Sequence, residues 1–177
     1  MIRIGSQLTF CSPEKILRRA AVEQDGQNFI TNFFSLDDGI VEPAHTLFYD
    51  GILSAEIVSV KQSADISQIS NLLMDYRFLD LSESIPPGEI GRTDKPLVID
   101  IGTTSADKFN PLLPHLALAL SAYSIFEIIA ACTYYPALLL GRTAGLAVGR
   151  RSRLLLWEHA DLIKKELTPD TRVREMN

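Results

Sequence analysis

Strand-forming residues dominate the N-terminal third of the chain. Residues 2–10 alternate apolar and polar positions, and residues 29–34 are rich in aromatic and β-branched side chains, as is typical of strands. Residues 16–24 fit either a helix or a strand, but the Asp25-Gly26 hairpin signal that follows them favours a strand. The pattern therefore predicts three consecutive strands.

Two shorter apolar segments follow. Residues 46–49 and 52–60 have the pattern of strands separated by an Asp50-Gly51 turn, and Asp37-Asp38-Gly39 predicts the turn before them. We therefore expect the first 60 residues to form a mostly antiparallel sheet.

The pattern changes in the middle of the chain. Apolar residues near helical spacing predict a helix over 65–79, capped by Asp65 or Ser67. Residues 82–96 are rich in Pro, Gly and charge and predict an exposed loop. The apolar segment at 97–101 predicts a short buried strand of the parallel-sheet type.

Two further helices are expected. The first covers 110–122, with Asn110 as its cap. The second covers 124–140 and begins with a capping box, because Glu127 stands three residues after Ser124.

Proline and glycine residues shape the C-terminal third. Pro136 must interrupt the second helix and Gly141 is its C-cap candidate. A glycine hairpin with a short strand at 146–148 is expected next, then a strong strand at 154–157 and an edge strand at 171–176.

Composition and charge limit the class of protein. The 177 residues suit one domain or two small ones that share a core, and the net charge of −5 without a long basic run disfavours nucleic-acid binding. The longest apolar region, 112–140, is interrupted by charge and proline and falls short of the roughly 18 uninterrupted residues of a membrane span. Cys11 and Cys132 fit two buried, reduced thiols, and the N-terminus has no apolar leader. A cytoplasmic protein without a membrane segment is expected.

Three stretches carry a resemblance to a known family. Residues 47–63 include a Gly-Ile-Leu run, residues 101–105 read Ile-Gly-Thr-Thr-Ser, and residues 128–149 run from Ile-Ile-Ala-Ala-Cys to Val-Gly. In order and spacing they resemble the amidohydrolase superfamily, the metal-dependent hydrolases related to cytosine deaminase. Such enzymes flank a metal-binding (β/α)8 barrel with a small sandwich built from both chain ends.

The resemblance implies an α+β fold. Residues 1–60 and 142–177 would form the composite β-sandwich, and residues 61–141 would be an α/β remnant of the barrel. The helices near 65–79, 110–122 and 124–140 would cover that remnant.

The departures from the family pattern concern the metal ligands. Lys61 and Ser63 stand where the HxH motif has its histidines, and Thr104 stands where the metal-binding aspartate is expected. A hydrolytic metal needs imidazoles and a carboxylate to hold it and to activate its water. The resemblance therefore implies that no metal and no cofactor is bound.

The length of the chain points to a missing barrel. A complete barrel takes about 250 residues, whereas the interval from Lys61 to Thr104 has room for one helix and one loop. We expect residues 52–60 and 97–101, the first and last barrel strands, to pair in parallel through a right-handed crossover.

Two groups of residues are candidate sites. The first is a pocket at the former metal site, formed by Lys61, Ser63, Asp100, Thr103 and Thr104. Asp100 would cap a neighbouring turn or face a sheet edge, because a carboxylate buried without partners is costly. The threonines could offer hydroxyls to a small ligand, or form a plain turn.

The second group could hold an anion or an acidic partner, although solvated charge is the usual explanation for such arginines. Its members bracket the glycine hairpin and are Arg142, Arg150, Arg151 and Arg153. The histidines lie in different elements at no metal-ligand spacing, at His45, His115 and His159.

These observations favour a non-catalytic amidohydrolase-like protein with a structural, regulatory or small-ligand-binding role. Loss of a barrel would expose apolar faces, so a homodimer through the helical surface 112–140 is expected. One alternative is a hydrolase of C–N bonds with an atypical or intersubunit site. Another is an anion- or nucleic-acid-binding module that uses the arginine hairpin.

Overall fold

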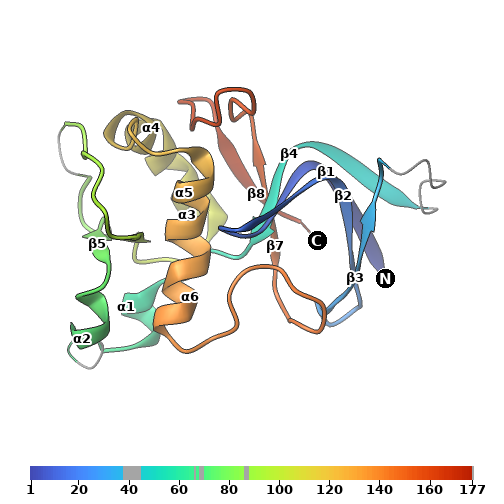
Figure 1. Cartoon of the computed structure of the whole chain (residues 1–177), viewed down its shortest axis with the longest axis horizontal. Helices are drawn as coiled ribbons and strands as arrows, with labels where there is room; N and C mark the ends of the chain where they lie inside the picture. Colours follow the sequence, from blue (N-terminus) through green and yellow to red (C-terminus); the bar gives the residue numbers. More distant parts are fainter. Residues whose placement is uncertain (38–44, 66, 68–69, 86–87, 177) are drawn as a thin grey trace.

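A curled sheet and a helical part lie side by side in the computed structural model of the chain (Figure 1). The structure describes residues 1–37, 45–65, 67, 70–85 and 88–176. The strands are β1 (Ile2–Ser12), β2 (Lys15–Gln24), β3 (Ile30–Ser35), β4 (Thr46–Ala55), β5 (Arg77–Asp80), β6 (Leu97–Asp100), β7 (Leu154–Glu158) and β8 (Arg172–Met176). The helical segments are α1 (Val60–Ser63), α2 (Ser70–Leu73), α3 (Ala106–Phe109), η2 (Asn110–Leu112), α4 (Leu113–Ala119), α5 (Ile125–Ile129), η3 (Ala130–Tyr134) and α6 (Tyr135–Leu139).

Six strands from both ends of the chain form one mixed sheet in the order β3-β2-β1-β4-β7-β8. The pairs β1-β2, β2-β3, β4-β7 and β7-β8 are antiparallel, whereas β1 and β4 run parallel. The three N-terminal strands and the strand pair at the C-terminus confirm the sequence prediction. The α+β class is confirmed as well.

The sheet curls so that its edge strand β3 contacts the segment that precedes β7. The backbone N–H of Ile30 donates to the carbonyl of Arg150 (2.8 Å), and that of Ser152 donates to Asn28 (3.0 Å). These bonds join the start of β3 to the segment that leads into β7. An apolar core fills the curled sheet and contains Ile4, Val22, Ile30, Leu53 and Leu154. The sheet therefore encloses a core as a sandwich does, although its six strands form one continuous hydrogen-bonded sheet.

The Asp50-Gly51 turn expected from the sequence is a bulge inside one continuous strand. Opposite Gln7 of β1, the strand β4 carries both Asp50 and Gly51, so the register shifts there. Gly51 has a φ of 148°, and a Cβ at this position would lie 2.4 Å from the carbonyl oxygen of Trp157. The glycine therefore serves a close approach of two strands, which local turn signals do not reveal.

The parallel pairing expected between residues 52–60 and 97–101 is wrong. β4 ends at Ala55 and belongs to the large sheet, and β6 pairs instead with β5 in a separate parallel two-stranded sheet. The segment after β4 leaves the ladder because the N–H of Val58 donates to the carbonyl of Cys132 (3.0 Å). Ser59 then caps α1.

The single helix expected over 65–79 is also wrong where the structure describes it. The four-residue helix α1 precedes this segment, a second four-residue helix, α2, lies inside it, and Arg77–Asp80 forms β5. The side chain of Asp65 accepts from the N–H of Ser67 (2.9 Å), which closes a local turn in place of a long-helix cap. Residues 66, 68 and 69 lie outside the described part of the chain, as do parts of the expected turn at 37–39 and loop at 82–96.

The helix expected over 110–122 begins earlier, at Ala106, and runs through α3, η2 and α4 to Ala119. Asn110 is not its cap. Its amide nitrogen donates to the carbonyl of Val173 (2.9 Å) and its oxygen accepts from the Val173 N–H (2.7 Å). The side chain thus continues the β8 ladder and ties the helix to the sheet.

The helix expected over 124–140 is confirmed in three joined pieces, α5, η3 and α6. Ser124 and Glu127 form the predicted capping box. A π-helical turn precedes Pro136, which stands in the first turn of α6 where its missing N–H costs no internal bond. Gly141, with a φ of 65°, ends the helix as expected. It donates to Leu138, and the following N–H donates to the carbonyl of Ala137, in a Schellman pattern.

The strand expected at 146–148 is absent; these residues form a loop. The N–H of Leu146 donates to the carbonyl of Cys11 (3.1 Å). A Cβ on Gly145 would lie 1.8 Å from that carbonyl oxygen. Contact with β1 therefore fixes the loop, and a local strand propensity does not decide its shape.

The main core joins the two parts of the molecule. Phe109, Leu113 and Leu116 of the helical part are fully buried with Ile52 and Trp157 of the sheet. Within 112–140, only Leu118 (71%) and Leu138 (42%) are large apolar side chains with high exposure. The continuous exposed apolar face expected there is thus absent, because the helices pack on the sheet. No helix in the described residues is long and apolar enough to cross a membrane.

Candidate functional site

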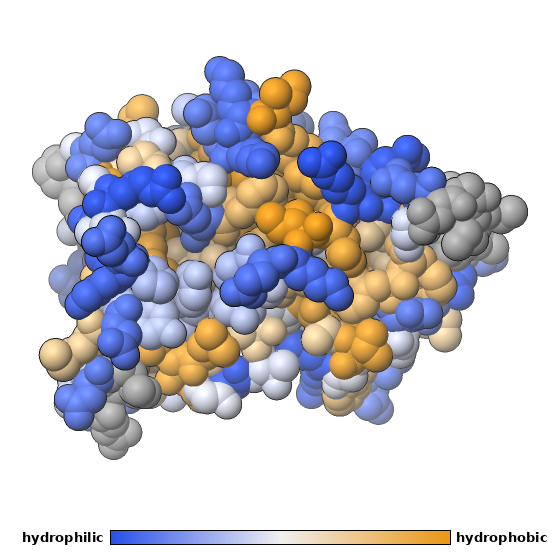
Figure 2. Space-filling view, in the orientation of Figure 1, coloured by the Kyte–Doolittle hydropathy of each residue, from blue (hydrophilic) through white to orange (hydrophobic). Residues whose placement is uncertain are grey.

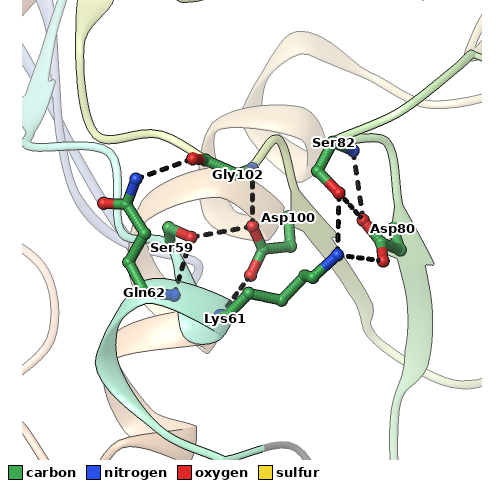
Figure 3. Close-up of polar contacts among 7 residues, drawn as sticks. All are labelled: Ser59, Lys61, Gln62, Asp80, Ser82, Asp100 and Gly102. Atoms are coloured by element: carbon green, nitrogen blue, oxygen red, sulfur yellow. Dashed lines mark hydrogen bonds and ion pairs between the residues drawn. The ribbon is translucent and has the colours of Figure 1, made fainter.

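Asp100, the last residue of β6, is the centre of a buried polar cluster (Figure 3). It exposes none of its surface. Its Oδ1 accepts from the hydroxyl of Ser59 (2.9 Å) and from the N–H of Gly102 (2.8 Å). Its Oδ2 accepts from the N–H of Lys61 (2.7 Å). The carboxylate thus caps both the turn that follows β6 and the start of α1, one of the two roles expected from the sequence.

Local structure holds these donors in place. Ser59 also accepts from the N–H of Gln62 (3.3 Å), and the side chain of Gln62 donates to the carbonyl of Gly102 (2.7 Å). Gly102 has a φ of 68°, and a Cβ there would lie 2.7 Å from the Cβ of Ser82. The glycine is required both by its left-handed backbone and by the close approach of the segment after β5.

The side chain of Lys61 forms a second, more exposed cluster. Its Nζ lies 2.8 Å from Asp80 Oδ2 and 2.8 Å from Ser82 Oγ. The hydrogen bond to Asp80 raises the pKa of Lys61. Partial burial raises the pKa of Asp80, but the hydrogen bonds from Lys61 and Ser82 outweigh it, so the net pKa is lowered. Lys61 therefore donates its backbone N–H to the carboxylate of Asp100 and pairs its ammonium group with the carboxylate of Asp80.

Cys132 of the π-helical turn lies against this cluster. Burial raises the pKa of its thiol, and the charge of Asp100 raises it further. Cys11 is also buried and free. Both thiols are therefore held in the protonated form, as expected for structural cysteines.

The cluster contains only part of the candidate pocket. Lys61 and Asp100 meet, but Ser63 is exposed on α1, and Thr103 accepts from the N–H of Ser105 (3.1 Å) to shape the turn before α3. Thr104 lies half-buried in the same turn. Ser59 is not among the residues predicted for the site, although Ser59-Val60-Lys61-Gln62 is a capping-box pattern. Asp80 follows the expected helix at 65–79 and Ser82 begins the expected loop at 82–96, and no sequence pattern there predicts the end of a strand.

The four candidate arginines do not converge. Arg153 lies between Glu56 (3.1 Å) and Glu175 (3.3 Å), and Arg150 donates to the carbonyl of Gly145. Burial lowers the pKa of Arg150. Arg142 and Arg151 are exposed. Two of the four guanidinium groups thus have internal partners.

The described part of the chain contains no group of three or more His, Cys, Asp and Glu residues that could hold a metal ion. The histidines lie apart, with His45 and His159 at positive φ in turns. Asp100 has no imidazole beside it to complete a ligand set.

Two neighbouring cavities lie beside α5. The first, about 460 Å³, lies between the β1-β2 turn, the 92–97 loop and α5, and aromatic rings of Phe10, Tyr123 and Tyr135 line it. The second, about 590 Å³, lies between β1, β2, α5 and the loop that contains residues 162–165. Ile16 and Phe126 line both. None of the five candidate pocket residues lines either cavity.

Comparisons with known proteins give little further information. No family model matches the chain, and no curated protein matches it. One solved structure with partial similarity is N-acetyl-D-glucosamine-6-phosphate deacetylase from Mycobacterium smegmatis. The match has 8% sequence identity and a TM-score of 0.26, and it covers 66% of this chain and 29% of that chain.

Proposed function

We propose that this chain is a non-catalytic amidohydrolase-like protein with a structural or small-ligand-binding role. Asp100 is the observation that carries the proposal. It occupies the end of the strand next to the candidate metal position, but its oxygens bind one hydroxyl and two amide donors of the chain itself.

The physical role of this arrangement is to join segments. The cluster ties the start of α1 to the end of β6, and the Lys61 pair ties α1 to the end of β5. A catalytic carboxylate has to present a lone pair to a metal or a substrate. Asp100, fully buried and held by three fixed donors, is better suited to stabilising the fold.

Metal analysis of the purified protein tests the proposal. After expression in medium supplemented with zinc, iron and manganese, we expect far less than one metal ion per chain. Stoichiometric metal that disappears in a folded Asp100→Asn variant, but not in Asp80→Asn, would contradict the proposal. That result would favour the alternative, a hydrolase of C–N bonds with an atypical site.

The proposal includes a homodimer through the helical surface 112–140. Because most apolar residues of this segment are buried in the chain, Leu118 and Leu138 would have to supply the apolar contacts. Light scattering at micromolar concentration should then give a dimer mass, and Leu118→Glu should shift it toward the monomer. A monomer mass for the unmodified chain would contradict this part of the proposal.

A further inference from the structure

The second cavity beside α5 combines apolar walls with an excess of positive charge among the described residues. Leu8, Ile16 and Phe126 form an apolar wall, and the charged residues that line it are Arg18, Arg19, Lys165 and Asp37. Among the described residues, three cations thus face one carboxylate, on a chain whose net charge is −5. Figure 2 shows apolar surface in the middle of the viewed side of the molecule, with strongly polar residues beside it.

A backbone irregularity brings the two arginines together. Consecutive strand residues point to opposite faces, yet Arg18 and Arg19 line the same cavity. Arg19 has a φ of 39°, and the β1-β2 register omits the pair that it would form with Gln7. A positive φ is unfavourable for a residue with a Cβ, so the arrangement is maintained against a local cost.

The opposite wall is a loop held by its own hydrogen bonds. Asp161 and Glu166 exchange backbone hydrogen bonds (3.1 Å each), and the carbonyl of Lys165 accepts from the N–H of Ile125 (2.7 Å). The last bond fixes Lys165 at the start of α5. The same loop carries Ile163, which is 94% exposed at the rim of the cavity.

The cations differ in what they bind. Nη1 of Arg19 lies 3.4 Å from Oδ1 of Asp37, so these two residues form an ion pair. Arg18 and Lys165 have no ion-pair partner among the residues that the structure describes. A charged group of the opposite sign can therefore bind between them without displacing an internal pair.

The first cavity offers an apolar surface next to the cationic one, where the apolar part of a bound anion could lie. It shares Ile16 and Phe126 with the second, and beyond them lie Phe10 and Tyr135. Its charged residues balance in sign, and Arg92 is paired with Glu127. The two cavities are therefore neighbours across Ile16 and Phe126, one cationic and the other aromatic and electrically balanced, and together they are here called the path.

We infer that this path binds an amphipathic carboxylate, with the anionic head group at Arg18 and Lys165 and the apolar chain over Ile16 and Phe126. The inference rests on the ligand-binding form of the proposed function. None of the residues that line the path belongs to the Asp100 cluster, so a failed ligand titration and a positive metal analysis are separate results.

Calorimetric titration with decanoate and with decyltrimethylammonium provides the test. Decanoate should saturate one site per chain, and the cation of equal chain length should bind at least tenfold more weakly. Non-specific attraction to a chain of net charge −5 would give the reverse order. From octanoate to decanoate, the affinity should rise roughly fourfold per added methylene.

The variants locate the site. Arg18→Gln with Lys165→Gln should weaken decanoate binding at least tenfold, whereas the matched pair Arg142→Gln with Arg151→Gln should leave it unchanged. Equal loss in both pairs, equal binding of the cation, or no saturable binding would overturn the inference. Binding to phosphatidylglycerol vesicles that decanoate does not compete would overturn it as well, because it would assign the charges to a membrane surface.

Discussion

Two charged regions of the molecule differ in how their charges are satisfied. At Asp100, a fully buried carboxylate binds three donors of the chain, and the neighbouring segments are fixed by it. Beside α5, Arg18 and Lys165 line an apolar cavity and have no ion-pair partner within the described residues. The chain itself supplies the hydrogen-bond donors of the Asp100 cluster. The cavity lined by Arg18 and Lys165, here called the open region, leaves these two cations without an ion pair within the described residues.

The difference separates structural charge from charge that is available to a ligand. Burying a carboxylate is unfavourable unless hydrogen bonds replace its hydration, so a complete donor set is the condition for Asp100 to be buried at all. Exposed cations keep their hydration and meet no such requirement. When they lie at the end of an apolar cavity, they can attract an anion whose apolar part gains from burial.

Replacement of Asp100 should have the largest effect. Asp100→Ala leaves the Ser59 hydroxyl and the amides of Lys61 and Gly102 without an acceptor. Because each buried unsatisfied donor costs on the order of 1–3 kcal/mol, we expect a loss of ~3 kcal/mol or more in the free energy of unfolding. Urea denaturation followed by circular dichroism measures it.

Asp80→Ala is the matched control for that experiment. Asp80 ends the neighbouring strand β5 at the same level of the sheet, but its side chain is 42% exposed. Its removal should cost much less than that of Asp100. Equal losses would show that burial does not distinguish the two carboxylates and would break the comparison.

The Lys61-Asp80 pair should give a smaller and pH-dependent effect. The lowered pKa of Asp80 stabilises the fold above its unfolded pKa of about 3.9, and this contribution is lost as the pH falls through the folded pKa. The raised pKa of Lys61 stabilises the fold below its unfolded pKa of about 10.4, and this contribution is lost as the pH rises through the folded pKa. The pair should therefore matter most between these limits.

Lys61→Gln tests this pH dependence because it removes the ammonium and keeps the backbone N–H that Asp100 binds. The difference in urea midpoint between the unmodified chain and the variant should be small near pH 7, and should shrink below pH ~4 and above pH ~10. A loss as large as that of Asp100→Ala would mean that the side chain, and not the backbone, supports the buried cluster.

The sequence predicts the fold best where local chemistry decides it. The capping box at Ser124, the bend at Pro136 and the C-cap at Gly141 depend on residues within a few positions of one another, and all are confirmed. The strands at 16–24 and 154–157 are confirmed for the same reason, since each has a clear β-type composition or a hairpin signal beside it.

Long-range contacts account for the errors. Gly51 looked like a turn residue, but it is required by the carbonyl of Trp157, more than a hundred positions away. Asn110 looked like a cap, but it binds the backbone of Val173. Within the candidate site, Asp100 was identified, and capping a turn was one of the two roles expected for it. Asp80 was missed because the pairing of Arg77–Asp80 with β6 is a long-range contact.

The open region should show the smallest effect on stability and the largest on binding. Arg18 and Lys165 are exposed and lack internal ion pairs within the described residues, so replacing both by glutamine should change the free energy of unfolding by no more than about 0.5 kcal/mol. The same variant should lose decanoate binding. Urea denaturation and calorimetric titration on one preparation measure both quantities.

A large loss of stability would show that these cations support the fold, and the open region would then resemble the Asp100 cluster. A stable variant that binds decanoate as tightly as the unmodified chain would show that the cations do not hold the head group.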